Sequence, residues 1–391
     1  MIRIAILTHG GVGPQGSTEL IPALVNLVSR LSRLFDITVY SATGRANETS
    51  SFACGNAQVR YVDARYDDHI ARIFLAFRQS LLSDHKELPF ELLHGIWSYP
   101  SGLAAVILGK ILHLPSFVTV FGGEAASVQR IRYGHMLKLP LRALTLWTCR
   151  KATALVTLTE FQRSLLKKHG LKRADIAVIP TGTTEAFSDL FKPKTLNLPI
   201  RFLHVANLTE VKDQITLLKA FRIISTNINA RLRIIGPDYM NGKIQQTADQ
   251  LGIAEHVTFL GYVHQEAILE HYAWAHMMLH TSLYEGQALV VNEAAASGVV
   301  VCGTRVGLIA DLEDSCTIAV ATGDHQGLAK KVLDLLNNPS QFVRLQTNAH
   351  TWAANHNLDW TVKRYTEVYQ GCVQNKGTKA DSETNDVQRQ R

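Results

Sequence analysis

Short apolar runs alternate with longer amphipathic runs along most of this chain, and this alternation restricts the possible fold more than any other feature of the sequence. Residues 2–8 (IRIAILT) have the length and composition of a buried strand, and residues 17–35 carry apolar side chains at helical spacing. The alternation continues to residues 176–180 (IAVIP). Because strands separated by helices usually pair in parallel, the pattern predicts a doubly wound parallel α/β sheet.

A second alternation follows a segment that has little periodicity. Residues 181–199 contain prolines and glycine but no helical or strand pattern, so we place a domain boundary near residue 190. RFLHVAN then opens another series of strands and helices. With 391 residues, 46% hydrophobic and 19% charged, the chain can form two domains with sizeable cores. We expect Rossmann-like domains at residues 1–190 and 191–358, and a disordered polar tail at residues 374–391.

Cysteine spacing and the amino-terminal sequence indicate a cytoplasmic protein. The five cysteines show neither CxxC nor CxH spacing, which argues against a disulfide framework or a zinc site (Cys54, Cys149, Cys302, Cys316 and Cys372). The first residues lead directly into a strand without the pattern of a signal peptide, and no run of about 18 apolar residues occurs. We therefore expect neither export nor a membrane span.

Positive charge is concentrated in the first half of the chain. Residues 1–200 hold 23 Lys and Arg against 14 Asp and Glu, whereas residues 201–391 hold 17 against 19. This asymmetry suggests an anionic partner such as phosphate or an acidic membrane, although a mildly basic domain would have the same composition. Residues 130–151 mix cations with Leu, Met and Trp, which fits either a bilayer-docking surface or core. Without interleaved stacking aromatics, we expect no nucleic-acid partner.

Two glutamates flank an apolar segment in the second half. The run MMLH (277–280) is typical of a buried strand, and we expect the following helix to start near Gln287. Glu285 would then lie where a strand ends and a helix begins, the edge at which parallel sheets bind ligands. Glu293, eight positions later, could hold the other end of the same ligand. The alternative is a helix cap and a solvated glutamate.

A glycine-rich loop follows the first strand. Gly11, Gly13 and Gly16 have the GxGxxG spacing of dinucleotide-binding loops, whose amides approach a pyrophosphate. The second strand does not end in an acidic residue, although Arg45 could suit a 2′-phosphate. An NADP-dependent oxidoreductase therefore remains an alternative to a loop that admits another phosphate or a sugar.

Three further side chains are candidates for the same cleft. His94 and Glu124 follow the apolar runs of two other first-domain strands. His94 is either a core histidine or a catalytic one, whereas the two glycines before Glu124 suggest close approach of a ligand. Lys212 lies where we expect a helix to start, and a cation there opposes the helix dipole unless it binds an anion such as phosphate; the alternative is a solvated lysine.

Several segments, in this order and spacing, resemble the GT-B glycosyltransferases of family 4, which are retaining enzymes that use nucleotide sugars. They are VIPTG (178–182), VANLTEVKD (205–213), IIGPD (234–238), VTFLGYV (257–263) and EGQALVVNE (285–293), with its continuation AAASG. The resemblance extends to about residue 372. It implies two Rossmann-like domains that face a central cleft, with a last helix at residues 359–372 that packs back on the first domain.

The resemblance also implies roles for individual residues. Lys212 would bind the donor diphosphate, Glu285 would face the donor sugar, and Glu293 would hold the ribose hydroxyls. The other donor-binding positions would be Asn207, Gly286, Gln287, Ala288, Leu289, Gly16 and Val263. On the first domain, acceptor contacts are expected from Gly11, Gly13, His94, Phe121, Gly122 and Glu124.

Three positions depart from the family pattern. Asn207 stands where the family often has an arginine that pairs with the lysine, and Phe121 replaces a histidine that contacts the sugar. EGQA replaces the usual EGFG. A catalytically degenerate nucleotide-sugar-binding protein that supports a partner enzyme is therefore an alternative function.

We expect retaining transfer of a sugar to an acceptor hydroxyl, in the synthesis of a cell-surface polysaccharide or glycolipid. No DxD motif stands out in the first domain, so we expect no metal and no cofactor besides the nucleotide-sugar substrate. The expected acceptor is a glycan or a lipid-linked glycan. The basic first domain could then bind peripherally to the inner face of the plasma membrane.

Overall fold

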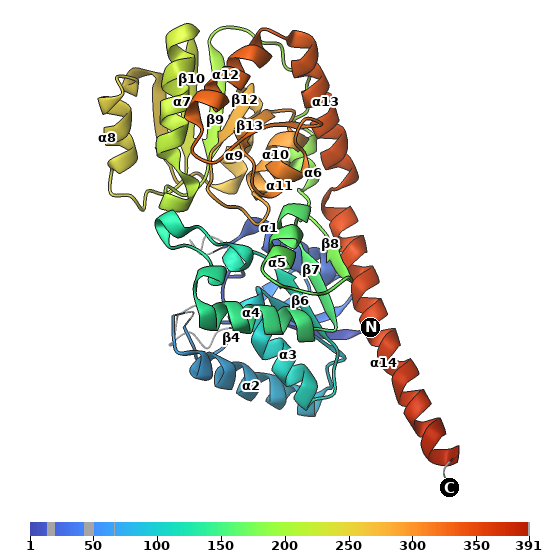
Figure 1. Ribbon diagram of the computed structural model, residues 1–391. Helices are drawn as coiled ribbons and strands as arrows, with labels where there is room; N and C mark the ends of the chain where they lie inside the picture. Colours follow the sequence, from blue (N-terminus) through green and yellow to red (C-terminus); the bar gives the residue numbers. More distant parts are fainter. Residues whose placement is uncertain (14–19, 43–50, 66, 390–391) are drawn as a thin grey trace.

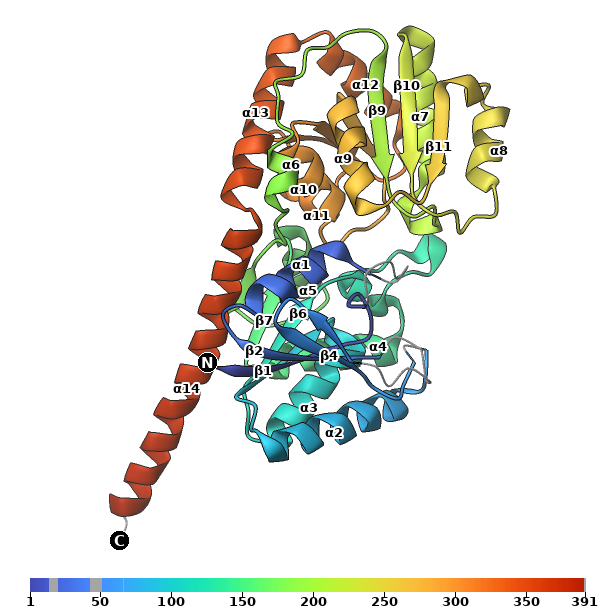
Figure 2. The ribbon, with the colours of Figure 1, turned by 180° about the vertical axis from the view of Figure 1, so that it is seen from behind.

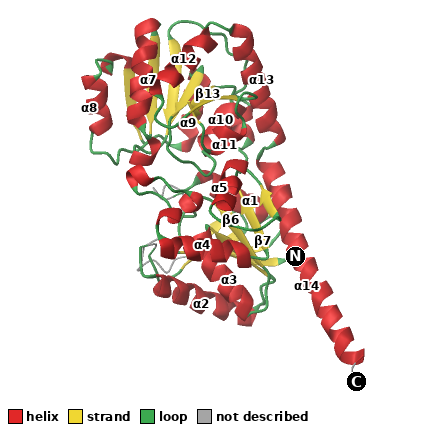
Figure 3. Cartoon of the chain, in the orientation of Figure 1, coloured by secondary structure: helices red, strands yellow, loops and turns green. Residues whose placement is uncertain are grey.

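The computed structural model contains two α/β domains, and the carboxy-terminal helix runs along the first of them (Figure 1). It describes the chain except residues 14–19, 43–50, 66 and 390–391, and it describes only the backbone of residues 265 and 375–389. Figure 3 shows that strands form the centre of each domain and that helices cover them. The predicted fold class is confirmed: the sequence forms two parallel, Rossmann-like sheets.

The first sheet has the strand order β3-β4-β2-β1-β5-β6-β7-β8, and every pairing is parallel except that of β3 with β4. Its strands are β1 (Arg3–Thr8), β2 (Asp36–Ser41), β3 (Phe52–Cys54), β4 (Ala57–Tyr61), β5 (Leu92–Ile96), β6 (Ser116–Val120), β7 (Ala154–Thr157) and β8 (Ile176–Val178). The strand order reverses between β1 and β5. The loops after these two strands therefore separate and leave a crevice at the carboxyl edge of the sheet.

Six helices belong to the first domain and its connection to the second. They are α1 (Pro22–Leu31), α2 (Ile70–Glu87), α3 (Leu103–Ile111), α4 (Leu139–Lys151), α5 (Glu160–Lys168) and the short linker helix α6 (Glu185–Ser188). Most strands of this sheet are buried along their length, because helices cover both faces; this explains their continuous apolar runs. The antiparallel strand β3 and helix α6 were not expected from the sequence.

The second sheet is parallel throughout, with the order β11-β10-β9-β12-β13-β14. Its strands are β9 (Ile200–Val205), β10 (Ala230–Ile235), β11 (Val257–Gly261), β12 (Met277–His280), β13 (Val300–Thr304) and β14 (Thr317–Val320). Its helices are α7 (Gln214–Asn227), α8 (Lys243–Gln250), α9 (Gln265–Trp274), α10 (Leu289–Ala296), α11 (Gly307–Asp311), α12 (His325–Leu336) and α13 (Pro339–Asn355). The order reverses between β9 and β12, which places the loops after these strands at the crevice.

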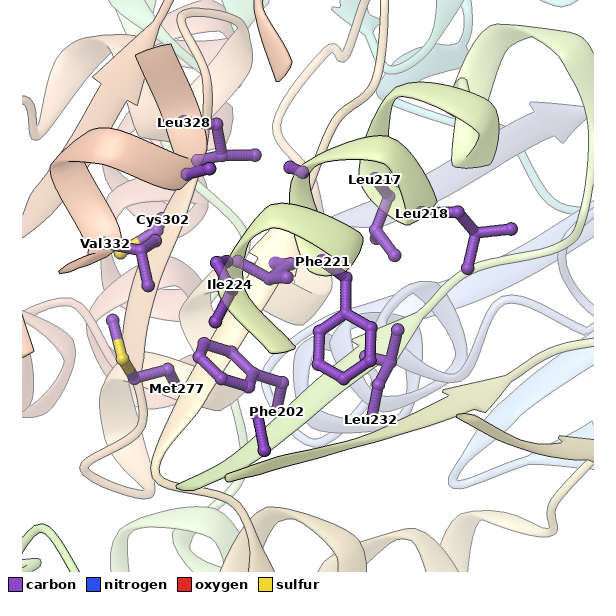
Figure 4. Close-up of a cluster of buried hydrophobic side chains, with 14 of the residues drawn as sticks. Phe202, Leu217, Leu218, Phe221, Ile224, Leu232, Met277, Cys302, Leu328 and Val332 are labelled. Carbon is purple, nitrogen blue, oxygen red and sulfur yellow. The ribbon is translucent and has the colours of Figure 1, made fainter. Parts of the chain in front are cut away.

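The core of the second domain forms where α7 and α12 cover this sheet (Figure 4). Leu217, Phe221 and Ile224 follow one another at helical spacing on α7 and are fully buried. Phe221 meets Phe202 of β9 edge to face, with ring centroids 5.9 Å apart. Met277 of β12 lies beside Phe202 in register. This packing fixes β9 and β12, the two strands that carry the crevice loops.

Helix α14 (Leu358–Arg389) returns to the first domain and extends beyond it (Figures 1 and 2). Tyr365 and Tyr369 of α14 are fully buried and contact Phe117 of β6 edge to face. The disordered tail expected from residue 374 is not found, because the helix continues to Arg389. This stretch contains no proline, and only Gly377 is a strong helix breaker among its Gln, Lys, Ala, Glu and Arg residues.

Helix boundaries near the crevice differ from those expected. Lys212 ends a short 3₁₀ turn, and α7 begins only at Gln214. Helix α10 begins at Leu289 and not at Gln287, because Ala288 has a left-handed backbone conformation (φ 67°). Helix α11, which connects β13 and β14, was missed because it is only five residues long. None of the helices in the described residues is both long and apolar enough to cross a bilayer.

Candidate active site between the two domains

A cavity of about 430 Å³ lies between the carboxyl edges of the two sheets. The first domain contributes Ile21, Trp97, Phe121, Gly122, Tyr133 and Leu158 to its wall, and the second contributes Val205, Ala206, Asn207, Val211, Lys212, His280 and Tyr284 to Val290. The second-domain residues follow β9 and β12, the strands at which the sheet order reverses. The cavity therefore lies where open α/β sheets bind ligands.

Glu285 is the centre of the hydrogen-bond network in this cavity. Its Oε1 atom accepts hydrogen bonds from Lys212 Nζ at 2.6 Å and from Ser282 Oγ at 2.6 Å. His280 Nε2 lies 2.9 Å from the same oxygen. The sequence motif identified Glu285 and Lys212 but not Ser282 and His280, which have no role in the family pattern that we used.

The surroundings of Glu285 keep its carboxyl group charged. Burial alone would raise the pKa of Glu285, but the Lys212 ammonium and the His280 ring outweigh this effect and hold the pKa well below its usual range. Lys212 and Glu285 thus form a partly buried ion pair. An incoming phosphate would find a cation already desolvated and aimed into the cavity.

Two glycines, Gly286 and Gly307, allow the backbone after Glu285 to pack closely against neighbouring segments. A Cβ atom on Gly286 would meet the carbonyl oxygen of Phe121 at 3.1 Å, so the loop approaches the first domain closely. Gly307, which has φ 54°, leaves room behind the loop: its Cβ atom would lie 2.7 Å from the Gln287 carbonyl oxygen and 2.8 Å from Glu285 Cβ. These glycines let the loop reach the cavity without strain.

Gln287 joins this loop to the connection between the domains. Its side-chain amide accepts a hydrogen bond from Thr181 N and donates one to Thr181 O, both at 2.9 Å. Asn292 Nδ2 donates to the same carbonyl oxygen at 3.1 Å. The side chain of Gln287 is 2% exposed and therefore not free for the donor. What remains for ligand binding at this position is the backbone, as the resemblance implied.

Glu293 does not line the same cavity as Glu285. It faces a narrow pocket beside Leu289, whose side chain borders both cavities. Tyr272, fully buried on α9, donates its hydroxyl hydrogen to Glu293 Oε2 at 2.5 Å. Burial raises the pKa of Glu293, and the hydrogen bond from Tyr272 opposes that rise. The sequence did not identify Tyr272, since nothing in its spacing links it to Glu293.

Glu124, expected to contact the acceptor, forms hydrogen bonds with the protein backbone instead. Its carboxylate accepts hydrogen bonds from the amides of Ser98, Phe121 and Gly122 at 3.0, 3.2 and 2.6 Å. It is 1% exposed and does not line the cavity. Glu124 thus ties the loop after β5 to the loop after β6, which is a structural role.

His94 is also a core residue, which corrects its assignment to the acceptor site. Its ring bonds Tyr369 Oη at 2.8 Å and Thr119 Oγ1 at 2.9 Å. It is 1% exposed, and burial lowers the pKa of His94 to about 3. Its partner Tyr369 comes from α14, so His94 fastens the returning helix to the first sheet.

The glycine-rich loop is described only as far as Gly13. Gly11 is buried, and a Cβ atom there would meet Leu24, Ile21 and Trp97 within 3.3 Å; neither Gly11 nor Gly13 is among the lining residues. Gly16 and Arg45 lie outside the described residues. Val263 packs against the second-domain core and does not line the cavity.

All the residues that depart from the family pattern line the cavity: Asn207, Phe121, Gln287 and Ala288. Phe121 faces Trp97, with ring centroids 5.4 Å apart, and Asn207 lies on the opposite side. The Asn207 carbonyl oxygen accepts a hydrogen bond from Gln214 Nε2 at 3.1 Å. Within the described part of the chain, no group of three or more His, Cys, Asp or Glu is arranged to hold a metal ion.

The domains contact each other around the cavity mouth. Thr159 Oγ1 donates to the Gly286 carbonyl oxygen at 2.7 Å, and Tyr284 Oη donates to the Gly122 carbonyl oxygen at 3.1 Å. Asp311 accepts from the Phe161 amide at 2.8 Å. The loop after β12 and the end of α11 therefore both touch the first domain.

Two parallel α/β domains that face a cavity with a lysine and a glutamate define a nucleotide-sugar-dependent transferase of GT-B architecture. The chain matches the family models for glycosyl transferases group 1 (residues 188–352) and for the glycosyl transferase 4-like domain (residues 21–182). It belongs to the group 1 glycosyltransferases, a retaining family that takes sugars from nucleotide-sugar donors. The resemblance seen in the sequence is confirmed, and the family replaces the NADP-dependent oxidoreductase alternative.

The individual proteins that this chain resembles share only part of its length or have low sequence identity with it. N-acetyl-alpha-D-glucosaminyl L-malate synthase of Bacillus anthracis is 33% identical over 138 residues, which are 35% of this chain and only 36% of that protein. Sucrose-phosphate synthase of Thermosynechococcus elongatus superposes with a TM-score of 0.79 at 17% identity, over 95% of this chain and 99% of that one. Anabaena HepE, solved with UDP-glucose, has a TM-score of 0.73 at 16% identity and coverages of 95% and 100%. These structural likenesses establish the fold.

Proposed function

We propose that the protein transfers a sugar from a nucleotide-sugar donor to an acceptor hydroxyl with retention of configuration. The observation that carries this proposal is the Lys212–Glu285 ion pair in the interdomain cavity. Its nitrogen and oxygen are 2.6 Å apart. The pair provides a cation that can bind a phosphate and, in direct contact with it, a carboxylate that can bind a sugar.

Lys212 has the main electrostatic role in this mechanism. As the bond to the leaving diphosphate breaks, negative charge develops on the phosphate oxygens, and a preorganised cation lowers the energy of that state. Leu289 and Val290, at the amino end of α10, line the same cavity, so the first amides of that helix can add to the stabilisation. Glu285 then faces the sugar, while Ser282 and His280 hold its carboxylate in place.

Glu293 is proposed to bind the ribose of the donor. It lies on α10 about one turn beyond the loop, and Tyr272 holds one of its oxygens. Leu289 separates its pocket from the main cavity. Donor binding at both glutamates would therefore place the nucleoside beside Leu289 and the sugar beside Glu285.

We further propose that the acceptor belongs to a cell-surface polysaccharide or glycolipid and that the first domain binds an anionic membrane. Lys138, Leu139, Arg150 and Lys151 are exposed at the two ends of α4, and Leu139 is 77% exposed. Such a mixture of cations and an apolar side chain suits the bilayer surface. Flotation with vesicles of an anionic phospholipid at low salt tests this part; absence of binding would contradict it.

The transfer itself is tested with a panel of nucleotide sugars. UDP-glucose is the first to try, since HepE was solved with it. Calorimetry measures binding, and NMR of the product measures the anomeric configuration. Binding followed by transfer with a retained anomer is expected. Binding without hydrolysis or transfer across the acceptor panel would instead favour the degenerate binding protein. Asn207 and Phe121, which depart from the family pattern, are the reason to test this alternative.

A further inference from the structure

Among the described residues, the first-domain side of the cavity, where we expect the acceptor, has no charged side chain. Each of the six first-domain residues that line it is apolar, aromatic or glycine: Ile21, Trp97, Phe121, Gly122, Tyr133 and Leu158. The ionisable lining groups Lys212, His280 and Glu285 come from the second domain. Residues 14–19, whose placement is not described, contain no lysine or arginine. This distribution of charge restricts the acceptors that the wall can accommodate.

Two partly exposed rings of this wall, Trp97 and Tyr133, are held in fixed positions. Trp97 has a left-handed backbone conformation (φ 64°), which is unfavourable for a bulky residue and persists because the surrounding structure imposes it. The hydrogen bond from Ser98 N to Glu124 fixes the next residue, and the Trp97 amide donates to the Thr119 carbonyl oxygen at 2.9 Å. The indole also packs against His9, with ring centroids 4.4 Å apart.

Tyr133 is fixed from the other side of the wall. Its hydroxyl lies so close to Gly123 that a Cβ atom there would be 2.5 Å away. Its ring lies 6.2 Å from that of Tyr284. Burial, Glu285 and Glu124 raise the pKa of Tyr133 to about 12, so the ring faces the cavity as a neutral phenol. Preorganised aromatic rings at both ends suit a flat, weakly polar ligand surface.

An anionic acceptor would find no partner on this wall. Lys212 is already paired with Glu285, and donor binding would engage it with the diphosphate. Burial and His135 lower the pKa of His9 to about 4, so its ring behind Trp97 is neutral near pH 7. Arg130, near the cavity edge, lies 3.7 Å from Asp213. A carboxylate or phosphate on the acceptor would thus be buried unpaired and repelled by Glu285.

We propose that the acceptor unit is an uncharged sugar whose C–H face stacks on Trp97 and Tyr133. One face of a pyranose ring is largely C–H groups, which match an aromatic surface, while its hydroxyls remain free at the ring edge to reach the donor. This assignment rests on the proposed transferase function. It adds the chemical class of the acceptor, which the donor-side residues do not determine.

Matched acceptor pairs test the assignment. Each pair is the p-nitrophenyl glycoside of a neutral hexose and that of the corresponding uronic acid, for the gluco, galacto and manno series. We expect transfer to at least one neutral member with kcat/KM about tenfold or more above its uronide. Equal or better transfer to a uronide overturns the proposal, as does donor hydrolysis without transfer to any neutral glycoside. Lack of donor binding and hydrolysis would instead contradict the proposed function.

Four variants distinguish the contribution of this wall from that of the rest of the enzyme. Trp97→Leu is expected to raise the acceptor KM about tenfold, while Trp147→Leu on α4 leaves it unchanged. Leu158→Arg places a cation on the wall and should improve the uronide relative to the neutral glycoside. Arg45→Ala tests whether Arg45, whose position the structure does not describe, binds an anionic acceptor. An acceptor preference unaffected by Trp97→Leu and Leu158→Arg, or a uronide activity lost in Arg45→Ala, would overturn the assignment.

Discussion

Lys212 and Glu285 lie 73 positions apart in the chain, yet their side chains are joined by a hydrogen-bonded ion pair of 2.6 Å. The pair forms because β9 and β12 are neighbours in the second sheet, although two strands and three α-helices separate them in sequence. In the unliganded protein each residue neutralises the other. Donor binding therefore requires Lys212 to exchange a carboxylate for a phosphate, and Glu285 to exchange an ammonium for sugar hydroxyls.

Replacing Lys212 should impair transfer more than folding. Lys212→Ala removes the cation beside the leaving diphosphate, and we expect kcat to fall about 10²- to 10³-fold. Steady-state kinetics with the best donor measures this. Lys219→Ala, on the exposed face of α7, is the matched control and should retain activity. Turnover at the wild-type rate in Lys212→Ala would disprove its role.

Tyr272 should affect donor affinity through Glu293. Tyr272→Phe keeps the buried ring but deletes the hydrogen bond that orients the Glu293 carboxylate. We expect the donor KM to rise about tenfold, corresponding to one hydrogen bond of about 1–1.5 kcal/mol, with little change in kcat. Tyr239→Phe, whose side chain is exposed, serves as control. A lower kcat at unchanged KM would show that Glu293 acts on the chemical step instead.

Gln287 should connect the donor loop to the interdomain segment. Gln287→Ala leaves the amide of Thr181 without its partner and removes one of the two donors to the Thr181 carbonyl oxygen, which should reduce the free energy of unfolding by about 2–3 kcal/mol. Donor binding should weaken as the loop loses this anchor. Chemical denaturation and calorimetry measure the two effects, and Gln79→Ala on the exposed face of α2 should change neither. Unchanged stability in Gln287→Ala would argue that water replaces the side chain.

Alanine substitutions at two glycines should change stability in opposite directions. Gly307→Ala introduces a Cβ atom that would collide with the Gln287 carbonyl oxygen and with Glu285, at a left-handed position. We expect a loss of about 1–3 kcal/mol in stability and weaker donor binding. Gly371→Ala, in α14 with no atom within 4 Å of the added Cβ, should be neutral or stabilising by up to about 1 kcal/mol. Thermal unfolding of both variants tests the contrast.

Stability should fall as the pH decreases below about 6.5. Burial lowers the pKa of His94 from 6.5 to about 3, so between these values the unfolded chain binds a proton that the folded chain does not. The native state is therefore favoured fully above pH 6.5, and His94 alone should cost about 2 kcal/mol between pH 7 and pH 5.

Urea denaturation of the wild type and of His94→Gln at pH 5, 6 and 7 isolates this effect. The variant should be less stable at pH 7, because its contacts with Tyr369 and Thr119 are disturbed, but its stability should depend less on pH. His204, whose pKa burial also lowers to about 3, contributes in the same direction in both proteins. Identical slopes for the two proteins would show that His94 is not responsible.

The sequence predicted the fold well because strand and helix periodicity is a local property. Continuous apolar runs such as IRIAILT identified buried strands. Strands that alternate with helices pair in parallel through right-handed crossovers, so the alternation predicts a parallel sheet covered by helices. The same reasoning placed Lys212 and Glu285 at the crevice, since the carboxyl ends of parallel strands share one edge. Short elements were missed because α11 and β3 span five and three residues, too few to show a period.

Only the tertiary structure decided which polar side chains face the cavity and which serve the protein itself. Glu124 and His94 follow strands just as Glu285 does, but one is saturated by three backbone amides and the other by hydroxyls of Tyr369 and Thr119. Tyr369 lies 275 positions from His94, and the Ser98 amide lies 26 positions from Glu124, so these bonds leave no periodic signal in the sequence.

The sequence by itself therefore determined the two parallel sheets, the family and the position of the crevice, because these follow from local pattern and from short motifs. The tertiary structure decided the environment of each side chain: the ion pair of Lys212, the anchoring of Gln287 to Thr181, and an acceptor wall without charge. Such environments depend on contacts between distant segments, and burial and charge at a site are properties of the assembled fold.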